Sequence, residues 1–122
     1  MKTVLIADDE PPLRTLVRVT LESDQYRIVE ASNGPQTLEM VKREHPDLVL
    51  LDIMMPGLDG FEVCRQIKTD PTTKSTVVVI LTARNYPQDR RRGMTMGADD
   101  YLKKPFSPLA LLSKIHDVLG LD

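Results

Sequence analysis

Short uninterrupted apolar runs alternate along the chain with segments in which apolar residues recur every three or four positions. Three runs, at 4–7, 48–51 and 77–81, have the length and composition of strands buried on both faces. Residues 26–31 predict a strand nearer a sheet edge, and residues 101–102 mark a short fifth strand. The segments between these strands predict amphipathic helices.

Turn residues and prolines support these helices. Those at 11–12, 32–35 and 107–108 suit helix starts, where a missing amide donor costs little. We expect Ser107 to be the N-cap of the last helix and Phe106 to pack onto its buried face. Alternation of five strands with helices predicts an α/β fold, in which a parallel sheet is covered on both faces.

Length and composition bound the class of protein. The 122 residues predict one domain, 1–122, with 41% hydrophobic and 28% charged residues, as in ordinary globular proteins. Sixteen basic and eighteen acidic side chains give a net charge of -2, so no overall positive field attracts nucleic acid. The net charge does not bear on whether the surface has a local basic patch.

The single cysteine and the hydropathy pattern predict a location. Cys64 has no partner for an internal disulfide, and we expect it to be an inert core residue. Residues 2–7 are too short for a signal-peptide core, and no apolar run has the length needed to span a bilayer. We therefore expect a cytoplasmic protein without membrane contact.

The segment 87–97 predicts the weakest of the helices. It is poor in apolar residues, and its interior Gly93 costs about 1 kcal/mol relative to alanine. The run Arg90–Arg92 is open to two interpretations: a solvated helix face, or ion pairs with Asp99 and Asp100 or with acids of a partner.

Polar residues end the buried strands, and they carry the candidate chemistry. Asp8 and Asp9 follow the first strand, Asp52 the third, Thr82 the fourth and Lys104 the fifth. Ligands of open parallel sheets bind at the carboxyl ends of strands, so we expect these side chains to converge. Three carboxylates repel one another unless a cation joins them, and magnesium prefers such oxygen ligands. The hydroxyl and the amine would then bind a phosphoryl group.

Each residue also has an ordinary structural explanation. The acids could cap the helices that follow them, Thr82 could be a strand-terminal hydroxyl, and Lys104 could be one of two solvated lysines. The set at successive strand ends favours a shared site over these separate explanations.

Four ordered motifs give the chain a resemblance to a known family. It closely resembles the receiver domains of bacterial two-component response regulators over essentially its whole length, above all those of winged-helix transcription regulators. The motifs are Asp8–Asp9, Asp52–Pro56 with Asp59–Gly60, Leu81–Ala83, and Gly97–Phe106. The resemblance implies a flavodoxin-like (βα)5 doubly wound sheet with strand order 2-1-3-4-5.

The resemblance also implies a phosphoacceptor and a metal site. Asp52 would take a phosphoryl group from the histidine of a sensor kinase. Asp9, Asp52 and the main-chain carbonyl of Met54 would bind Mg²⁺ or Mn²⁺ directly, and Asp8 would act through a metal-bound water. The domain would be a signalling phosphoacceptor that assists its own phosphorylation and dephosphorylation, rather than an enzyme.

Further residues are implied to transmit the signal. Thr82 and Lys104 would bind phosphoryl oxygens, and Tyr101 would be an aromatic switch that turns inward when Thr82 moves. Lys104–Pro105 is a candidate cis peptide. The weak segment 87–97 together with Tyr101 is expected to be the bistable element that phosphorylation shifts.

Partners follow from the same resemblance: a sensor histidine kinase or a phosphotransfer protein, and a homodimer through the last two helices and the fifth strand. DNA contact would come only through an output domain outside these residues. Leu111, Leu112 and Lys114 depart from the pattern of receivers that dimerise through that face, where a Glu-Leu pair and an arginine are usual.

Three rival functions can be weighed on the sequence. An aspartyl phosphohydrolase would need a second acid two residues after Asp52, where Met54 stands. A flavodoxin-like cofactor module would need a phosphate-binding loop after Ala7, and neither a Gly-rich nor a Ser/Thr-rich loop is found there. An interaction module without phosphorylation is disfavoured by the complete set of site residues.

Overall fold

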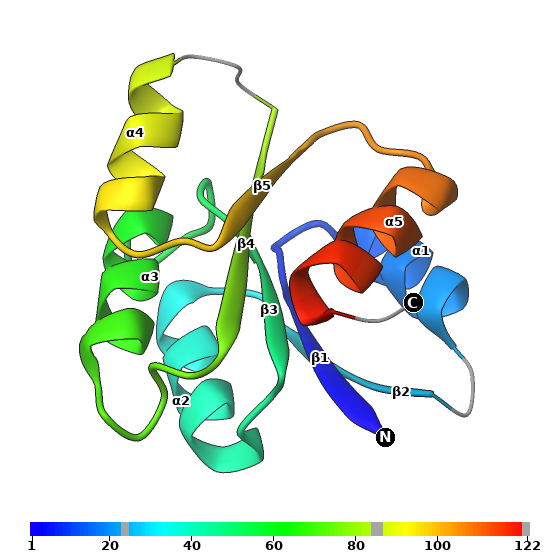
Figure 1. Ribbon diagram of the computed structural model, residues 1–122, viewed down its shortest axis with the longest axis horizontal. Coiled ribbons are helices and arrows are strands. Elements are labelled where there is room, and N and C mark those ends of the chain that lie inside the picture. Colours follow the sequence, from blue (N-terminus) through cyan, green and yellow to red (C-terminus); the bar gives the residue numbers. More distant parts are fainter. Residues whose placement is uncertain (23–24, 84–86, 121–122) are drawn as a thin grey trace.

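The structure is a computed structural model that describes residues 1–22, 25–83 and 87–120. Strands and helices alternate as predicted (Figure 1). They are β1 (Lys2–Ala7), α1 (Pro11–Leu21), β2 (Tyr26–Ala31), α2 (Gly34–Glu44), β3 (Leu48–Asp52), α3 (Gly60–Thr69), β4 (Val77–Thr82), α4 (Pro87–Thr95), β5 (Asp100–Lys103) and α5 (Pro108–Leu119).

The five strands form one parallel sheet in the order β2-β1-β3-β4-β5, which confirms the predicted topology. β1 lies between β2 and β3, so chain order reverses beside it. This is the position at which ligands bind in doubly wound sheets. β2 is an edge strand, as its mixed composition predicts.

Helices cover both faces of the sheet. Figure 1 shows α2, α3 and α4 on one side and α1 and α5 on the other. Each side has its own apolar cluster, one containing Val49, Leu51 and Ile80 and the other Val4, Leu50 and Leu81. Successive residues of β3 point to opposite clusters, and a strand buried on both sides must be apolar at nearly every position. Each fully buried side chain of this size contributes about 1.5–3 kcal/mol.

Side-chain caps fix several helix starts. Asn33 accepts a hydrogen bond from the Gln36 amide at 2.8 Å, which begins α2. Ser107 accepts one from the Ala110 amide at 3.0 Å and confirms the predicted N-cap of α5. Phe106 packs against the apolar cluster that contains Leu111, also as predicted.

Cys64 is buried in α3 and is a free thiol, as expected. Burial raises the pKa of its thiol to about 11. Among the described residues, no helix combines the length and apolar character needed to cross a membrane.

Candidate functional site

Four acidic side chains meet where β1 and β3 end. Asp52 is the last residue of β3, and Asp8, Asp9 and Glu10 follow β1 directly. One carboxylate oxygen of each lies within 4.8 Å of the others. Asp8 and Asp52 are buried, whereas Asp9 and Glu10 are exposed. The cluster is therefore anchored in the sheet and open to solvent on one side.

Lys104 brings a positive charge into this cluster. Its Nζ lies 2.7 Å from Asp8 Oδ2, 3.3 Å from Asp52 Oδ2 and 3.6 Å from Glu10 Oε1. The peptide bond from Lys104 to Pro105 is cis, as the sequence predicts. The structure thus brings together the first-strand acids, the third-strand acid and the amine.

Burial and charge shift two pKa values in the cluster. Burial, reinforced by the negative charge of Asp52, raises the pKa of Asp8, although the hydrogen bonds from Lys104 and the Glu10 amide oppose this rise. For Lys104 burial works against the charged form, but the hydrogen bond to Asp8 and the charges of both aspartates outweigh it and raise its pKa. The lysine therefore stays cationic near neutral pH.

One oxygen of each buried carboxylate accepts a hydrogen bond from a main-chain amide two residues further along the chain. Asp8 Oδ1 accepts a hydrogen bond from the Glu10 amide at 2.8 Å, and Asp52 Oδ1 accepts one from the Met54 amide at 2.9 Å. The second oxygen of each faces Lys104. These bonds fix both carboxylates without the helix-capping role that each acid could have had alone.

Thr82 lies at the end of β4, the strand beside β3. It is buried, and its carbonyl accepts a hydrogen bond from the Lys104 amide at 2.8 Å. The backbone of the fourth strand thus holds the lysine that enters the acidic cluster. Whether the Thr82 hydroxyl binds a phosphoryl group stays a prediction.

Tyr101 is buried beneath α4, and Gly93 makes room for it. A Cβ atom at position 93 would overlap the Tyr101 hydroxyl. The sequence identifies Gly93 only as a weakness of the helix, because a contact with a residue on another element leaves no local signal. The structure shows that the glycine gives the tyrosine its space.

The run Arg90–Arg92 does not form the ion pairs that one interpretation of the sequence predicts, as far as its side chains are described. The predicted pairs with Asp99 and Asp100 are wrong for Arg92, whose guanidinium lies 2.9 Å from Asp59 and 4.4 Å from the centroid of the Phe61 ring. Arg91 is exposed, and the Arg90 side chain lies outside the described part of the structure.

The two acids that follow α4 bind lysines of other helices. Asp99 pairs with Lys68 of α3 at 3.0 Å, and Asp100 pairs with Lys114 of α5 at 3.0 Å. Lys114 is one of the positions at which the chain departs from receivers that dimerise through this face. In this chain the Lys114 amine forms an intramolecular ion pair with Asp100.

Glu10 is a site residue that the sequence-based assignment omits. Its carboxylate belongs to the acidic cluster, and it contacts Lys104. Its position directly after Asp8 and Asp9 was the available signal, but a third consecutive acid is also typical of a solvated turn.

The residues present fit a hard divalent cation. Four carboxylate oxygens within 4.8 Å of one another, part buried and part open to water, match the kind of ligands that magnesium takes while it keeps some of its waters. A cation would also offset the repulsion among the acids, which a single lysine only partly offsets.

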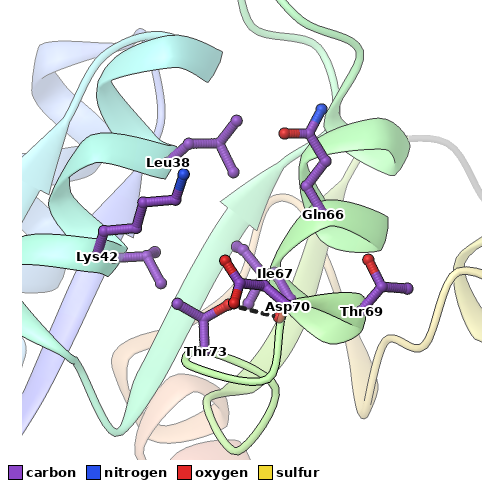
Figure 2. A pocket seen from close by; sticks show the side chains of 8 residues that line it. Leu38, Lys42, Gln66, Ile67, Thr69, Asp70 and Thr73 are labelled. Carbon is purple, nitrogen blue, oxygen red and sulfur yellow. Dashed lines mark hydrogen bonds between the residues drawn. The ribbon is translucent and has the colours of Figure 1, made fainter.

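A cavity of about 180 Å³ lies between α2 and α3 and is not part of this cluster (Figure 2). Two of its polar groups bond within the chain: Thr73 donates its hydroxyl to the Ile67 carbonyl at 2.7 Å, and Asp70 accepts from Thr72. The lining residues are Leu38, Val41, Lys42, Gln66, Ile67, Thr69, Asp70 and Thr73.

Known proteins are similar to this chain in sequence and in fold. The family model of the response regulator receiver domain matches residues 4–116. The phosphate regulon transcriptional regulatory protein PhoB of Pseudomonas aeruginosa is 42% identical over 118 residues, which are 97% of this chain and 52% of that protein. The chain thus spans about half the length of this relative.

Solved structures of receiver domains have the same fold as this chain. The activated (BeF3) N-terminal receiver domain of Klebsiella pneumoniae RstA has a TM-score of 0.87 and 32% identity, with 97% of this chain and 98% of that chain covered. The receiver domain of a Pseudomonas aeruginosa sensor histidine kinase, with magnesium coordinated in its active-site cleft, has a TM-score of 0.87 and 28% identity, with 98% of each chain covered. This chain therefore belongs to the response regulator receiver domain family of two-component signalling, and it is a signalling phosphoacceptor rather than a conventional enzyme.

Proposed function

We propose that Asp52 is the phosphoacceptor of this receiver domain and that its phosphorylation controls the α4–β5–α5 surface. The arrangement of Asp52 carries the proposal. It is buried at the end of a central strand, within an acidic cluster, and 3.3 Å from the Lys104 amine. A buried carboxylate that neighbouring groups orient, in a cluster that also has exposed members, is a candidate for such a function.

The reaction needs little covalent machinery. A carboxylate oxygen of Asp52 attacks the phosphorus of a phosphohistidine, the new O–P bond forms as the N–P bond breaks, and the imidazole nitrogen keeps the electron pair. Such transfers depend on alignment and on neutralising charge. Lys104 supplies one positive charge, and the Met54 amide orients one oxygen of the carboxylate.

The cation of this site is proposed to be Mg²⁺, or Mn²⁺ in its place. Asp9, Asp52 and the main-chain carbonyl of Met54 would bind it, and Asp8 would act through one of its waters. The carboxylate cluster supports this set, and the related kinase receiver was solved with magnesium in its cleft. When bound, the ion neutralises charge on the transferring phosphoryl group.

The signal is proposed to pass from Thr82 and Lys104, which bind phosphoryl oxygens, to Tyr101. Support comes from the packing of the Tyr101 hydroxyl against Gly93. Because the ring fills the space under α4, a change in its position must be accompanied by a change in that helix or its loop. α4 together with Tyr101 is thus the proposed bistable element.

Partners are proposed at two levels. Receiver domains act with sensor histidine kinases, and we assign a kinase or a phosphotransfer protein as the donor for this chain. A homodimer through α4, β5 and α5 is proposed as well. DNA contact is proposed only through an output domain outside residues 1–122, because the relatives it matches are named as transcriptional regulatory proteins. Residues 1–122 are proposed to form one receiver domain, and its cytoplasmic location stays a prediction.

Phosphorylation by a small-molecule donor tests the proposal. Wild type, Asp52→Asn and Asp59→Asn are incubated with acetyl phosphate and Mg²⁺, and intact masses are measured. Asp59 lies outside the acidic cluster, and asparagine retains an oxygen that can cap α3 as Asp59 does. We expect one phosphoryl group on wild type and Asp59→Asn and none on Asp52→Asn. Equal mass gain in all three would reject Asp52.

A further inference from the structure

An arginine lies behind the acidic cluster and binds its backbone. Arg14, on α1, donates from Nη1 to the Asp8 carbonyl at 2.8 Å. Its Nε donates to Glu30 Oε1, on β2, at 3.1 Å, and its side chain is only 20% exposed. The guanidinium therefore joins a helix, an edge strand and the loop that carries the acids.

The bond to the Asp8 carbonyl orients the next acid. That carbonyl belongs to the peptide unit that joins Asp8 to Asp9, and a peptide unit is planar, so holding its oxygen fixes the plane that leads into Asp9. The Asp8 amide is held separately, by the Ala31 carbonyl at 3.0 Å. Both peptide units of Asp8 are thus fixed, one by β2 and the other by Arg14.

Arg18 is a natural comparison on the same helix. It binds the same Glu30 carboxylate, at 2.7 Å from Nη2, but its other contact is the Ile28 carbonyl at 3.5 Å rather than the acidic loop. Its side chain is 45% exposed. Both arginines bind Glu30, but only Arg14 also binds the loop that carries the acidic cluster.

We propose that Arg14 is a positioning residue for cation binding: it holds the Asp8–Asp9 peptide unit so that both carboxylates face the cluster. This rests on the proposed metal site. Charge alone would act in the opposite direction, because a guanidinium near a cation site repels the cation. The sign of the effect therefore separates positioning from charge.

Mg²⁺ titrations of four proteins test this. Wild type, Arg14→Met, Arg14→Lys and Arg18→Met are followed by the amide NMR shifts of Asp9 and Glu10. We expect Arg14→Met to bind Mg²⁺ about fivefold more weakly, the effect of one lost hydrogen bond. Arg14→Lys keeps the charge but not the two-pronged donor geometry and should also be weaker. Arg18→Met should match wild type within about twofold.

Amide hydrogen exchange without metal gives a second readout. The Asp9 and Glu10 amides should exchange faster in Arg14→Met than in Arg18→Met, while β3 amides exchange equally. Equal or tighter Mg²⁺ binding by Arg14→Met, or equal weakening by Arg18→Met, would overturn the proposal. If wild type binds no Mg²⁺, the proposed metal site fails, and unchanged exchange at Asp9 would then reject the positioning role as well.

Discussion

Two neighbouring helices on one face of the sheet, α3 and α4, are held in opposite ways (Figure 1). α3 buries half of its ten residues, and these are Gly60, Phe61, Val63, Cys64 and Ile67. Among the described side chains of α4, at 91–95, only Gly93 is buried. The first helix is therefore held by apolar packing, whereas the described side chains of the second, at 91–95, make a few directed contacts.

The difference identifies the part of the domain that can move at low cost. Arg92 ties α4 to Asp59 and Phe61, at the start of α3, and Gly93 receives Tyr101 of β5. Exposed ion pairs and cation–π contacts contribute about 1 kcal/mol or less each. The contacts of α4 join the loop after Asp52, the proposed phosphoacceptor, to the proposed output surface, and each of them is weak.

The largest effect should come from the core of α3. Ile67 is 1% exposed, and Ile67→Ala should lower the free energy of unfolding by about 2–5 kcal/mol through lost burial and a cavity. Met94 of α4 is 56% exposed, so Met94→Ala should cost about 0.5 kcal/mol or less. Urea denaturation measures both. Similar losses would show that the two helices are anchored alike.

A double-mutant cycle tests the contact under α4. Gly93→Ala should push Tyr101 from its place and destabilise the fold by about 1–3 kcal/mol, despite the better helix propensity of alanine. In a Tyr101→Phe background the closest atom is gone, and the same substitution should cost clearly less. Fluorotyrosine NMR should show the Tyr101 resonance shifted in Gly93→Ala. Additive effects would contradict the contact.

Removing the contacts of Arg92 should increase local opening of α4 and change the free energy of global unfolding only slightly. Arg92→Met removes the bonds to Asp59 and the Phe61 ring, and we expect amides at 92–96 to exchange faster while the free energy of unfolding falls by about 1 kcal/mol or less. Arg91→Met, an exposed neighbour, is the control. Equal exchange in the two variants would show that Arg92 does not hold the helix.

The last effect is confined to alkaline pH and concerns the Cys64 thiol of α3. Its pKa of about 11 exceeds the ordinary 9.0, so its contribution to stability is complete below pH 9 and is lost as pH rises through about 11. Wild type should therefore lose stability over this range relative to Cys64→Ala. Thiol labelling of the native protein should keep rising up to about pH 11. A plateau near pH 9 would indicate that α3 opens readily.

Apolar runs made the sheet predictable, because strands buried on both faces tolerate few polar residues. The same logic placed Asp8, Asp52 and Lys104 together, since the ends of parallel strands meet at one edge. The partners of Arg92 and the place of the Tyr101 hydroxyl were not predictable. They depend on side-chain directions across elements far apart in sequence, which composition and periodicity do not encode.

Arg14 shows the same limit at the site itself. In the sequence it is one of two arginines on the polar side of the first helix, at the same spacing from an apolar stripe as Arg18. Only the fold distinguishes the residue that reaches the Asp8 carbonyl from the one that does not.

Locating the phosphorylated residue tests the central claim most directly. The protein is treated with acetyl phosphate and Mg²⁺, the acyl phosphate is reduced with borohydride to homoserine, and the changed residue is found by peptide mass spectrometry. We predict homoserine at position 52 alone. Reduction at Asp8, Asp9 or Glu10, with residue 52 unchanged, would contradict this account of the site.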